Sequence, residues 1–165
     1  MKKNLVKDII NLLILILVFF IVYFSVTGNE FLYGSLKDWN SQHWLFPEYF
    51  RNLFYETHDL LPDFAFNLGA GQNIYNFSYY GFLSPIILVS YLLPFIGMRD
   101  YIIISTIFML LFSVVLMYFF IKKKHNSKIA FICSFIFLMT TPLIFHSHRH
   151  IMFMNYMPFL IMGYY

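Results

Sequence analysis

The residues best suited to chemistry in this chain lie in GSLKDWNSQHW, residues 34–44, shortly after a long apolar run. Asp38 and Gln42 are four residues apart, so they would share one face of a helix, with His43 next in the chain. A carboxylate at this position can act as a general base on a hydroxyl about 3 Å away, or as a metal ligand. The alternative is an ordinary solvated acid near a helix end, and the residue types leave both interpretations open.

A second polar cluster, HSHRH, occupies residues 146–150. Arg149 offers planar bidentate donors and His148 adds ring donors, a combination that suits a phosphate group. His146 and His150 have a spacing compatible with zinc, but neither an H-E-x-x-H pattern nor a cysteine accompanies them. The cluster therefore favours a phosphate site over a zinc site, with a polar cap that ends a helix as the alternative.

Aromatic rings and amides alternate in LPDFAFNLGAGQNIYNFSYYGFLSP, residues 61–85. Amides such as Gln72 and Asn73 can meet sugar hydroxyls while ring faces stack on the pyranose, although a belt at the lipid interface needs the same residue types. LGAG lacks the lysine of a phosphate-binding loop and follows no strand, so we reject that match. Asp63 is the nearest acid that could join Asp38 at a divalent metal; the sequence requires neither this metal nor any other cofactor.

The composition that surrounds these clusters is that of a membrane protein. The 165 residues are 60% hydrophobic and only 12% charged, and the mean hydropathy is +0.68. A soluble domain of this size could not cover so much apolar surface with so few charges. The single cysteine, Cys133, excludes both an internal disulfide and a cysteine metal site. We therefore predict an all-α integral membrane fold.

Three apolar runs predict transmembrane helices, at residues 9–26, 101–121 and 129–145, and a partial span begins at about residue 151. The first run could instead be a signal peptide, but it is longer than the usual apolar region and no A-x-A site follows it. The basic segment KKKHNSK, residues 122–128, predicts a tight turn between antiparallel helices. Because the chain stays apolar to its last residue, we expect residues 1–165 to be the N-terminal part of one polytopic domain.

The placement of lysines predicts the topology. Lysines concentrate at the N-terminus and in residues 122–128, and the positive-inside rule assigns both segments to the cytoplasm. This requires residues 82–96, which are short and contain Pro94, to lie along the outer surface rather than to cross. Residues 27–100 then form one external loop that contains seven of the eight acids. An amphipathic helix at about 44–56 would lie at the lipid interface, either as a structural helix or as one wall of a lipid groove. Its predicted polar face carries Arg51.

The order of these parts resembles the bacterial YfhO-type membrane proteins and, more broadly, the polytopic GT-C glycosyltransferases. The resemblance rests on D-x-x-x-Q (Asp38 and Gln42), the helix with Arg51, NLGAGQN, YYGFLSP, LLPFIG and TTPLIFHSHRH. It implies a polyprenyl-phosphate sugar donor, with Asp38 as the catalytic acidic residue. Gln42, His43, Asp63, Gln72, Asn73, His148 and Arg149 would bind substrate.

The resulting hypothesis is a bacterial multi-pass glycosyltransferase that moves a sugar to a cell-envelope acceptor, similar to lipoteichoic acid, on the outer face. Its expected partners are the lipid-linked donor, the acceptor polymer and membrane lipid, and no nucleic acid is expected. A transporter or flippase component is the first alternative, although no Asp, Glu, Lys, Arg or His lies within the three predicted spans. An inactive truncated protein or a membrane-anchored interaction module is the other.

Overall fold

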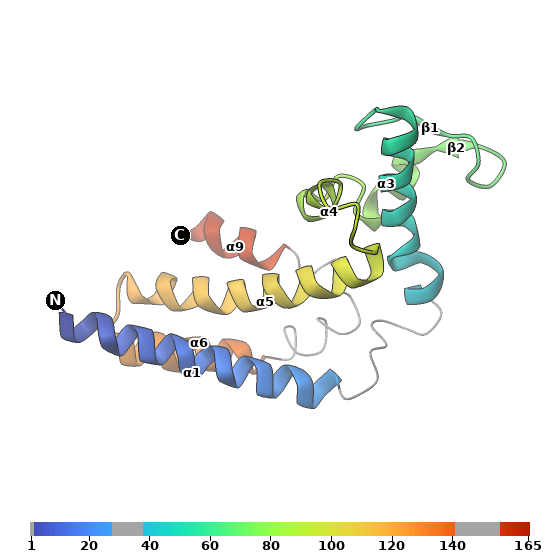
Figure 1. Ribbon diagram of the computed structural model, residues 1–165. Coiled ribbons are helices and arrows are strands. Elements are labelled where there is room, and N and C mark those ends of the chain that lie inside the picture. Colours follow the sequence, from blue (N-terminus) through green and yellow to red (C-terminus); the bar gives the residue numbers. More distant parts are fainter. Residues whose placement is uncertain (1, 28–37, 141–155) are drawn as a thin grey trace. The chain divides into compact units, whose positions relative to one another are not determined.

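The computed structural model describes residues 2–27, 38–140 and 156–165 (Figure 1). The described part is mostly helical, which confirms the coarse prediction of a helical protein, and it contains two very short strands. The chain divides into two compact units. The first comprises residues 1–34 and 106–165, and the second comprises residues 35–105.

Four helices contribute to the first unit: α1 (Lys2–Thr27), the part of α5 (Met98–Lys122) from Thr106 onward, α6 (Ser127–Leu138) and α9 (Met157–Tyr164). Figure 1 shows α1 and α6 side by side. Two helical segments, Leu5–Val26 and Met98–Lys122, are long and apolar enough to cross a membrane. Leucines such as Leu13 and Leu17 of α1 are exposed. An apolar surface of this kind suits contact with lipid chains.

The predicted turn after the second long helix is present, because four residues, Lys123 to Asn126, separate α5 from α6. Asn126 caps α6: its side-chain oxygen accepts hydrogen bonds from the backbone N–H groups of Lys128 (3.1 Å) and Ile129 (3.0 Å). α6 ends at Leu138, so it covers only part of the predicted span 129–145. Met139 and Thr140 follow α6 in a turn. The rest of that span, from residue 141, and the predicted start of a further span at 151 lie outside the described residues.

The second unit begins with the π-helical turn η1 (Trp39–His43), which leads into α3 (Leu45–Thr57). The strands β1 (Phe64–Ala65) and β2 (Gln72–Asn73) pair antiparallel, and the 3₁₀ helix η2 (Ile74–Tyr80) and α4 (Pro85–Ser90) follow. Its core contains fully buried aromatic and aliphatic side chains from η1, α3, η2, α4 and the segment between η2 and α4: Trp39, Phe50, Ile74, Phe82 and Ile87. Phe50 meets Phe82 edge-on, with ring centroids 5.1 Å apart.

The β1–β2 hairpin departs from a purely α-helical prediction, and the glycines of LGAG explain it. Gly69 and Gly71 have φ angles of +63° and +90°, a region that L side chains rarely adopt. A Cβ added to Gly71 would lie 3.0 Å from the Phe64 ring. These glycines therefore form the reversal of a hairpin.

The segment predicted as one helix at 82–96 is helical only over α4, Pro85–Ser90. Ser84 and Pro85 start this helix as expected, although the Ser84 hydroxyl makes no capping hydrogen bond. After Ser90 the chain continues in tight turns, with the N–H of Leu93 bonded to the Ser90 carbonyl at 3.0 Å. Pro94 explains the early end, because proline disfavours helical backbone at the residue before it and donates no hydrogen bond.

Candidate functional site

Asp38 lies at the N-terminal end of η1, and its side chain is exposed. In a π-helical turn the backbone hydrogen bonds span five residues, so residues four and five apart lie nearly above one another. The turn therefore keeps Gln42 close to the face that carries Asp38, as the spacing predicted. Turns of this type are frequent at functional sites.

Tyr80, from the end of η2, joins this cluster although it lies 38 residues beyond Gln42. Its hydroxyl donates a hydrogen bond to Oε1 of Gln42, and its ring lies 6.4 Å from that of His43. Burial, then the neighbouring Tyr79 and the charge of Asp38, raise the pKa of Tyr80 to about 12. Tyr80 thus stays a neutral donor at physiological pH. The structure brings Asp38, Gln42, His43 and Tyr80 together.

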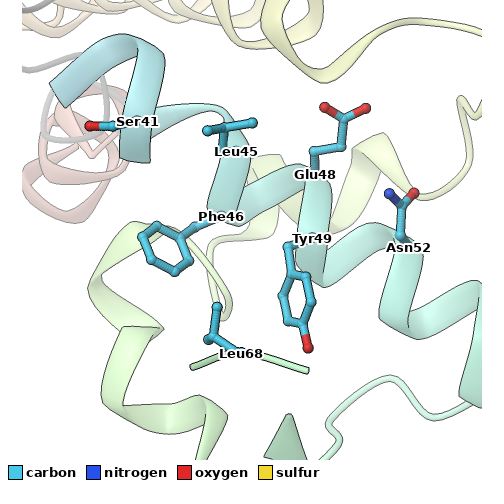
Figure 2. A pocket seen from close by; sticks show the side chains of 7 residues that line it. All are labelled: Ser41, Leu45, Phe46, Glu48, Tyr49, Asn52 and Leu68. Atoms are coloured by element: carbon cyan, nitrogen blue, oxygen red, sulfur yellow. The ribbon is translucent and has the colours of Figure 1, made fainter. Parts of the chain in front are cut away.

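A pocket of about 470 Å³ adjoins the cluster (Figure 2). It is lined by Ser41, Leu45, Phe46, Glu48, Tyr49, Asn52 and Leu68. Phe46 connects the two features, because it lines the pocket and also stacks on Tyr80 with ring centroids 4.5 Å apart. Figure 2 shows Phe46 and Tyr49 pointing toward Leu68, which precedes the hairpin glycines. The size suits a small ligand, and the lining combines apolar rings with a carboxylate, an amide and two hydroxyls.

Tyr49 has a further role at this pocket. Its hydroxyl donates a hydrogen bond to Oδ1 of Asn67, which ties α3 to the hairpin. Burial and the charge of Glu56 raise the pKa of Tyr49, so this hydroxyl also stays protonated at neutral pH. One wall of the pocket is therefore fixed by a bond between side chains.

The remaining predicted substrate residues are placed in different surroundings. Asp63 is exposed, and its backbone carbonyl accepts from the N–H of Ile74 at 3.1 Å. Gln72 donates to the Leu68 carbonyl at 3.4 Å, and Asn73 caps η2 by accepting from the N–H of Tyr75 at 2.9 Å. None of the three lines the pocket of Figure 2. Gln72 and Asn73 thus make hydrogen bonds that hold the hairpin and η2.

His148 and Arg149, predicted to bind phosphate, lie outside the described residues, as do His146 and His150. Within the described ranges, no three His, Cys, Asp or Glu side chains gather closely enough to hold a metal ion. The site that can be described is therefore the cluster around Asp38 together with the adjoining pocket.

The family model of the bacterial membrane protein YfhO matches residues 9–165. The chain belongs to this family. The match includes both units and confirms the resemblance to the YfhO-type membrane proteins. No curated protein and no solved structure matches the chain significantly.

Arg51 of this YfhO protein differs from its predicted position on the polar face of the amphipathic helix. Only 4% of its surface is exposed, and its Nη1 donates to the carbonyl oxygen of Ile96 at 2.9 Å. Its Nη2 lies 3.9 Å from the Glu48 carboxylate. The backbone turns around Pro94 expose carbonyl groups that a helix would have bonded, and a buried guanidinium can satisfy one of them. Helical periodicity alone could not predict this contact.

Tyr80 and the pocket residues of this YfhO protein were not predicted as site residues. Phe46 and Tyr49 belong to the expected apolar face of the amphipathic helix, and Glu48 and Asn52 belong to its polar face. The pocket lies where these two faces meet, close to Ser41. The sequence feature that could have indicated Tyr80 is the glycine that follows the aromatic pair Tyr79 and Tyr80. In the structure this residue, Gly81, has φ of +101° and ends η2 sharply.

Proposed function

We propose that the protein is a membrane glycosyltransferase of the GT-C type, or the N-terminal part of one. It transfers a sugar from a polyprenyl-phosphate donor to a cell-envelope acceptor, such as a lipoteichoic-acid polymer, on the outer face. Family membership supplies the membrane context. The observation that carries the proposal is the exposed carboxylate of Asp38 beside a pocket with an aromatic and amide lining.

Two features link Asp38 to this pocket. Ser41 lines the pocket and lies in η1, immediately after Asp38 in the fold. Phe46 lines it as well and stacks on Tyr80, whose pKa responds to the Asp38 charge. A ring such as Phe46 can pack against a sugar or a lipid chain, while Asn52 and Glu48 can bind hydroxyl groups. The pocket therefore suits the acceptor or the donor sugar.

In the proposed reaction, a hydroxyl of the acceptor attacks the anomeric carbon of the donor sugar. The Asp38 carboxylate takes the hydroxyl proton as the new C–O bond forms, and the bond between the sugar and the phosphate oxygen breaks. Polyprenyl phosphate leaves with the bonding electron pair. Arg149 and His148 are the proposed donors to that phosphate, because positive charge stabilises the developing negative charge. The side-chain oxygen of Gln42 accepts from Tyr80, so its N–H groups remain as donors. We propose that these donors bind the substrate beside Asp38.

The first test replaces the proposed base. Asp38→Asn removes the proton acceptor with almost no change in volume, so envelope glycosylation should fall by at least a factor of 100 while membrane abundance stays normal. Asp59→Asn is the matched control, because Asp59 is also an exposed acid of the second unit and Asn can still accept from the Leu61 N–H. Glycosylation that persists in Asp38→Asn would refute the role of this residue.

The proposed topology has both the N-terminus and the α5–α6 turn in the cytoplasm, and residues 27–100 outside. The contact between Asp8 of α1 and Lys122 of α5 supports it, because this ion pair joins the N-terminal turns of α1 to the last turn of α5. A reporter that is active only in the cytoplasm, fused after Lys124, should therefore be active. If only an exported reporter is active at this position, the segment 82–96 crosses the membrane and the topology is wrong.

A further inference from the structure

A basic surface lies at one end of the first unit, around the α5–α6 turn. Lys7 of α1, Lys123 and Lys124 of the turn, and Lys128 of α6 are all exposed. Asp8 is the one acid in the described part of this unit, and it is buried and paired with Lys122. The charges of the four exposed lysines are therefore not balanced by a described acid of the same unit.

The buried contacts of Asp8 explain why these lysines gather. Its Oδ1 accepts from the hydroxyls of Tyr118 (2.7 Å) and Ser127 (2.6 Å), and its other oxygen pairs with Lys122. Asn11, one turn further along α1, donates to the Tyr118 hydroxyl at 3.2 Å. We call these five residues the Asp8 cluster. It joins the start of α1 to the end of α5 and the start of α6, so lysines distant in sequence lie at one end.

A pocket of about 270 Å³ opens beside these lysines. Its polar residues are Lys123, Lys124 and His125, and its apolar and aromatic walls are Phe120, Ile121, Tyr164 and Tyr165. Lys123 lies over the Tyr165 ring, with its Nζ 3.3 Å from the ring centroid, and it also donates a hydrogen bond to the backbone oxygen of Tyr165. The pocket thus combines positive charge with an apolar wall that α5 and α9 provide.

We infer that this basic end binds the headgroup of an anionic phospholipid, with the phosphate at Lys124 and His125 and the upper acyl chain against Phe120 and Ile121. Charge complementarity selects the partner, since basic pockets between helices at a membrane surface attract anionic headgroups. The amphiphilic lining favours a lipid over a free anion, because a free anion would not use the apolar wall. This inference depends on membrane association and not on the proposed sugar transfer.

The experiment measures lipid binding to the purified protein in a neutral detergent, by native mass spectrometry with phosphatidylglycerol and with phosphatidylcholine. Phosphatidylglycerol should bind more tightly. Lys124→Gln should weaken it about fivefold, and Lys123→Gln combined with Lys124→Gln should weaken it about 25-fold. Arg99→Gln is the matched control, because Arg99 is an exposed cation at the opposite end of α5 and should leave binding unchanged.

Three results would overturn the inference. Equal binding of the two lipids would exclude selection by charge, and an equal loss in Arg99→Gln would indicate attraction by overall charge without a site. Displacement of phosphatidylglycerol by inorganic phosphate, at an ionic strength where sodium chloride does not displace it, would indicate a simple anion site. Circular dichroism of each variant checks that the helices are retained.

Discussion

Asp8 and Asp38 are both acids next to apolar segments, but Asp8 is buried in the first unit and Asp38 is exposed on the second. Asp8 is 6% exposed, and three neighbouring side chains meet its carboxylate. Asp38 is exposed at the start of a surface turn beside a pocket. Burying a carboxylate costs free energy unless hydrogen bonds or an opposite charge compensate it. A buried acid with such partners therefore has a structural role. An exposed acid beside a pocket can meet a substrate.

The partners of the two acids show the same contrast. Tyr118 donates directly to Asp8 and links two helices of the first unit. Tyr80 donates to Gln42, and the charge of Asp38 contributes to the raised pKa of Tyr80. A tyrosine therefore fixes an acid in one unit, whereas in the other it orients an amide near the acid. This difference predicts that substitutions at the Asp8 cluster reduce stability, and that substitutions at the Asp38 cluster reduce activity.

The largest loss of stability is expected for Asp8→Leu. It leaves Lys122, Tyr118 and Ser127 without their shared acceptor. Because the Lys122 side chain is 30% exposed, the loss should lie near the lower end of the about 3 to 5 kcal/mol that breaking a fully buried pair costs. Thermal unfolding in detergent, followed by circular dichroism, measures the loss. Adding Lys122→Met should restore part of it, because the unpaired charge is then removed.

Asp100→Asn is the control for this comparison, since Asp100 is an exposed acid in the first turn of α5. Its effect should stay below about 0.5 kcal/mol. If Asp8→Leu is equally mild, the buried cluster contributes little to the helix arrangement, and the contrast between the two acids fails.

An intermediate effect is expected for Tyr80→Phe, which removes the donor to Gln42 and keeps the ring that stacks on Phe46. Losing one such hydrogen bond costs about 1 kcal/mol. Transfer activity should fall more than stability does, because Gln42 loses its orientation beside Asp38. Tyr75→Phe serves as the control: its hydroxyl makes a longer bond of 3.3 Å, to the Leu61 carbonyl, at an exposed position. Unchanged activity in Tyr80→Phe would contradict the orienting role.

The sequence was sufficient to predict features that depend on local pattern. Apolar runs predicted α1 and α5, Ser84 and Pro85 predicted the start of α4, and the spacing of Asp38 and Gln42 predicted their shared face. Contacts between distant residues could not be predicted in this way. Asp8 and Ser127 are 119 residues apart, and Gln42 and Tyr80 are 38 apart. A single sequence has no periodicity that links such pairs.

Arg51 illustrates the same limit at one position. Helical spacing assigned it to the polar face, yet its environment depends on where a segment 45 residues away stops being helical. Pro94 was visible in the sequence as an interruption, but the carbonyl of Ile96 that Arg51 binds could not be deduced from it. Burial of a charged side chain depends on the acceptors that the rest of the fold leaves open.

The smallest effect at neutral pH is expected for Tyr91→Phe. The Tyr91 side chain is 5% exposed and stacks on Phe54 with ring centroids 5.1 Å apart, and within the described ranges its buried hydroxyl has no hydrogen-bond partner. Deleting such a hydroxyl should change the free energy of unfolding by less than about 0.5 kcal/mol. We expect a slight stabilisation, because a buried hydroxyl without a partner carries a desolvation cost that the deletion removes. The stacked ring is retained.

The same substitution should matter at high pH. Burial raises the pKa of Tyr91 to about 12 against the lowering effect of Arg51, while Tyr55 adds to the rise. The folded state therefore favours the protonated hydroxyl. The contribution of this hydroxyl to the free energy of unfolding is fully present below pH 10 and is lost as the pH rises from 10 through about 12. Tyr80 shares this pKa and adds to the loss. Unfolding measured at pH 7 and pH 11 should show a smaller alkaline loss in Tyr91→Phe than in the wild type. An equal alkaline loss would mean that Tyr91 ionises as easily in the folded chain as in the unfolded one, and that this hydroxyl is open to water.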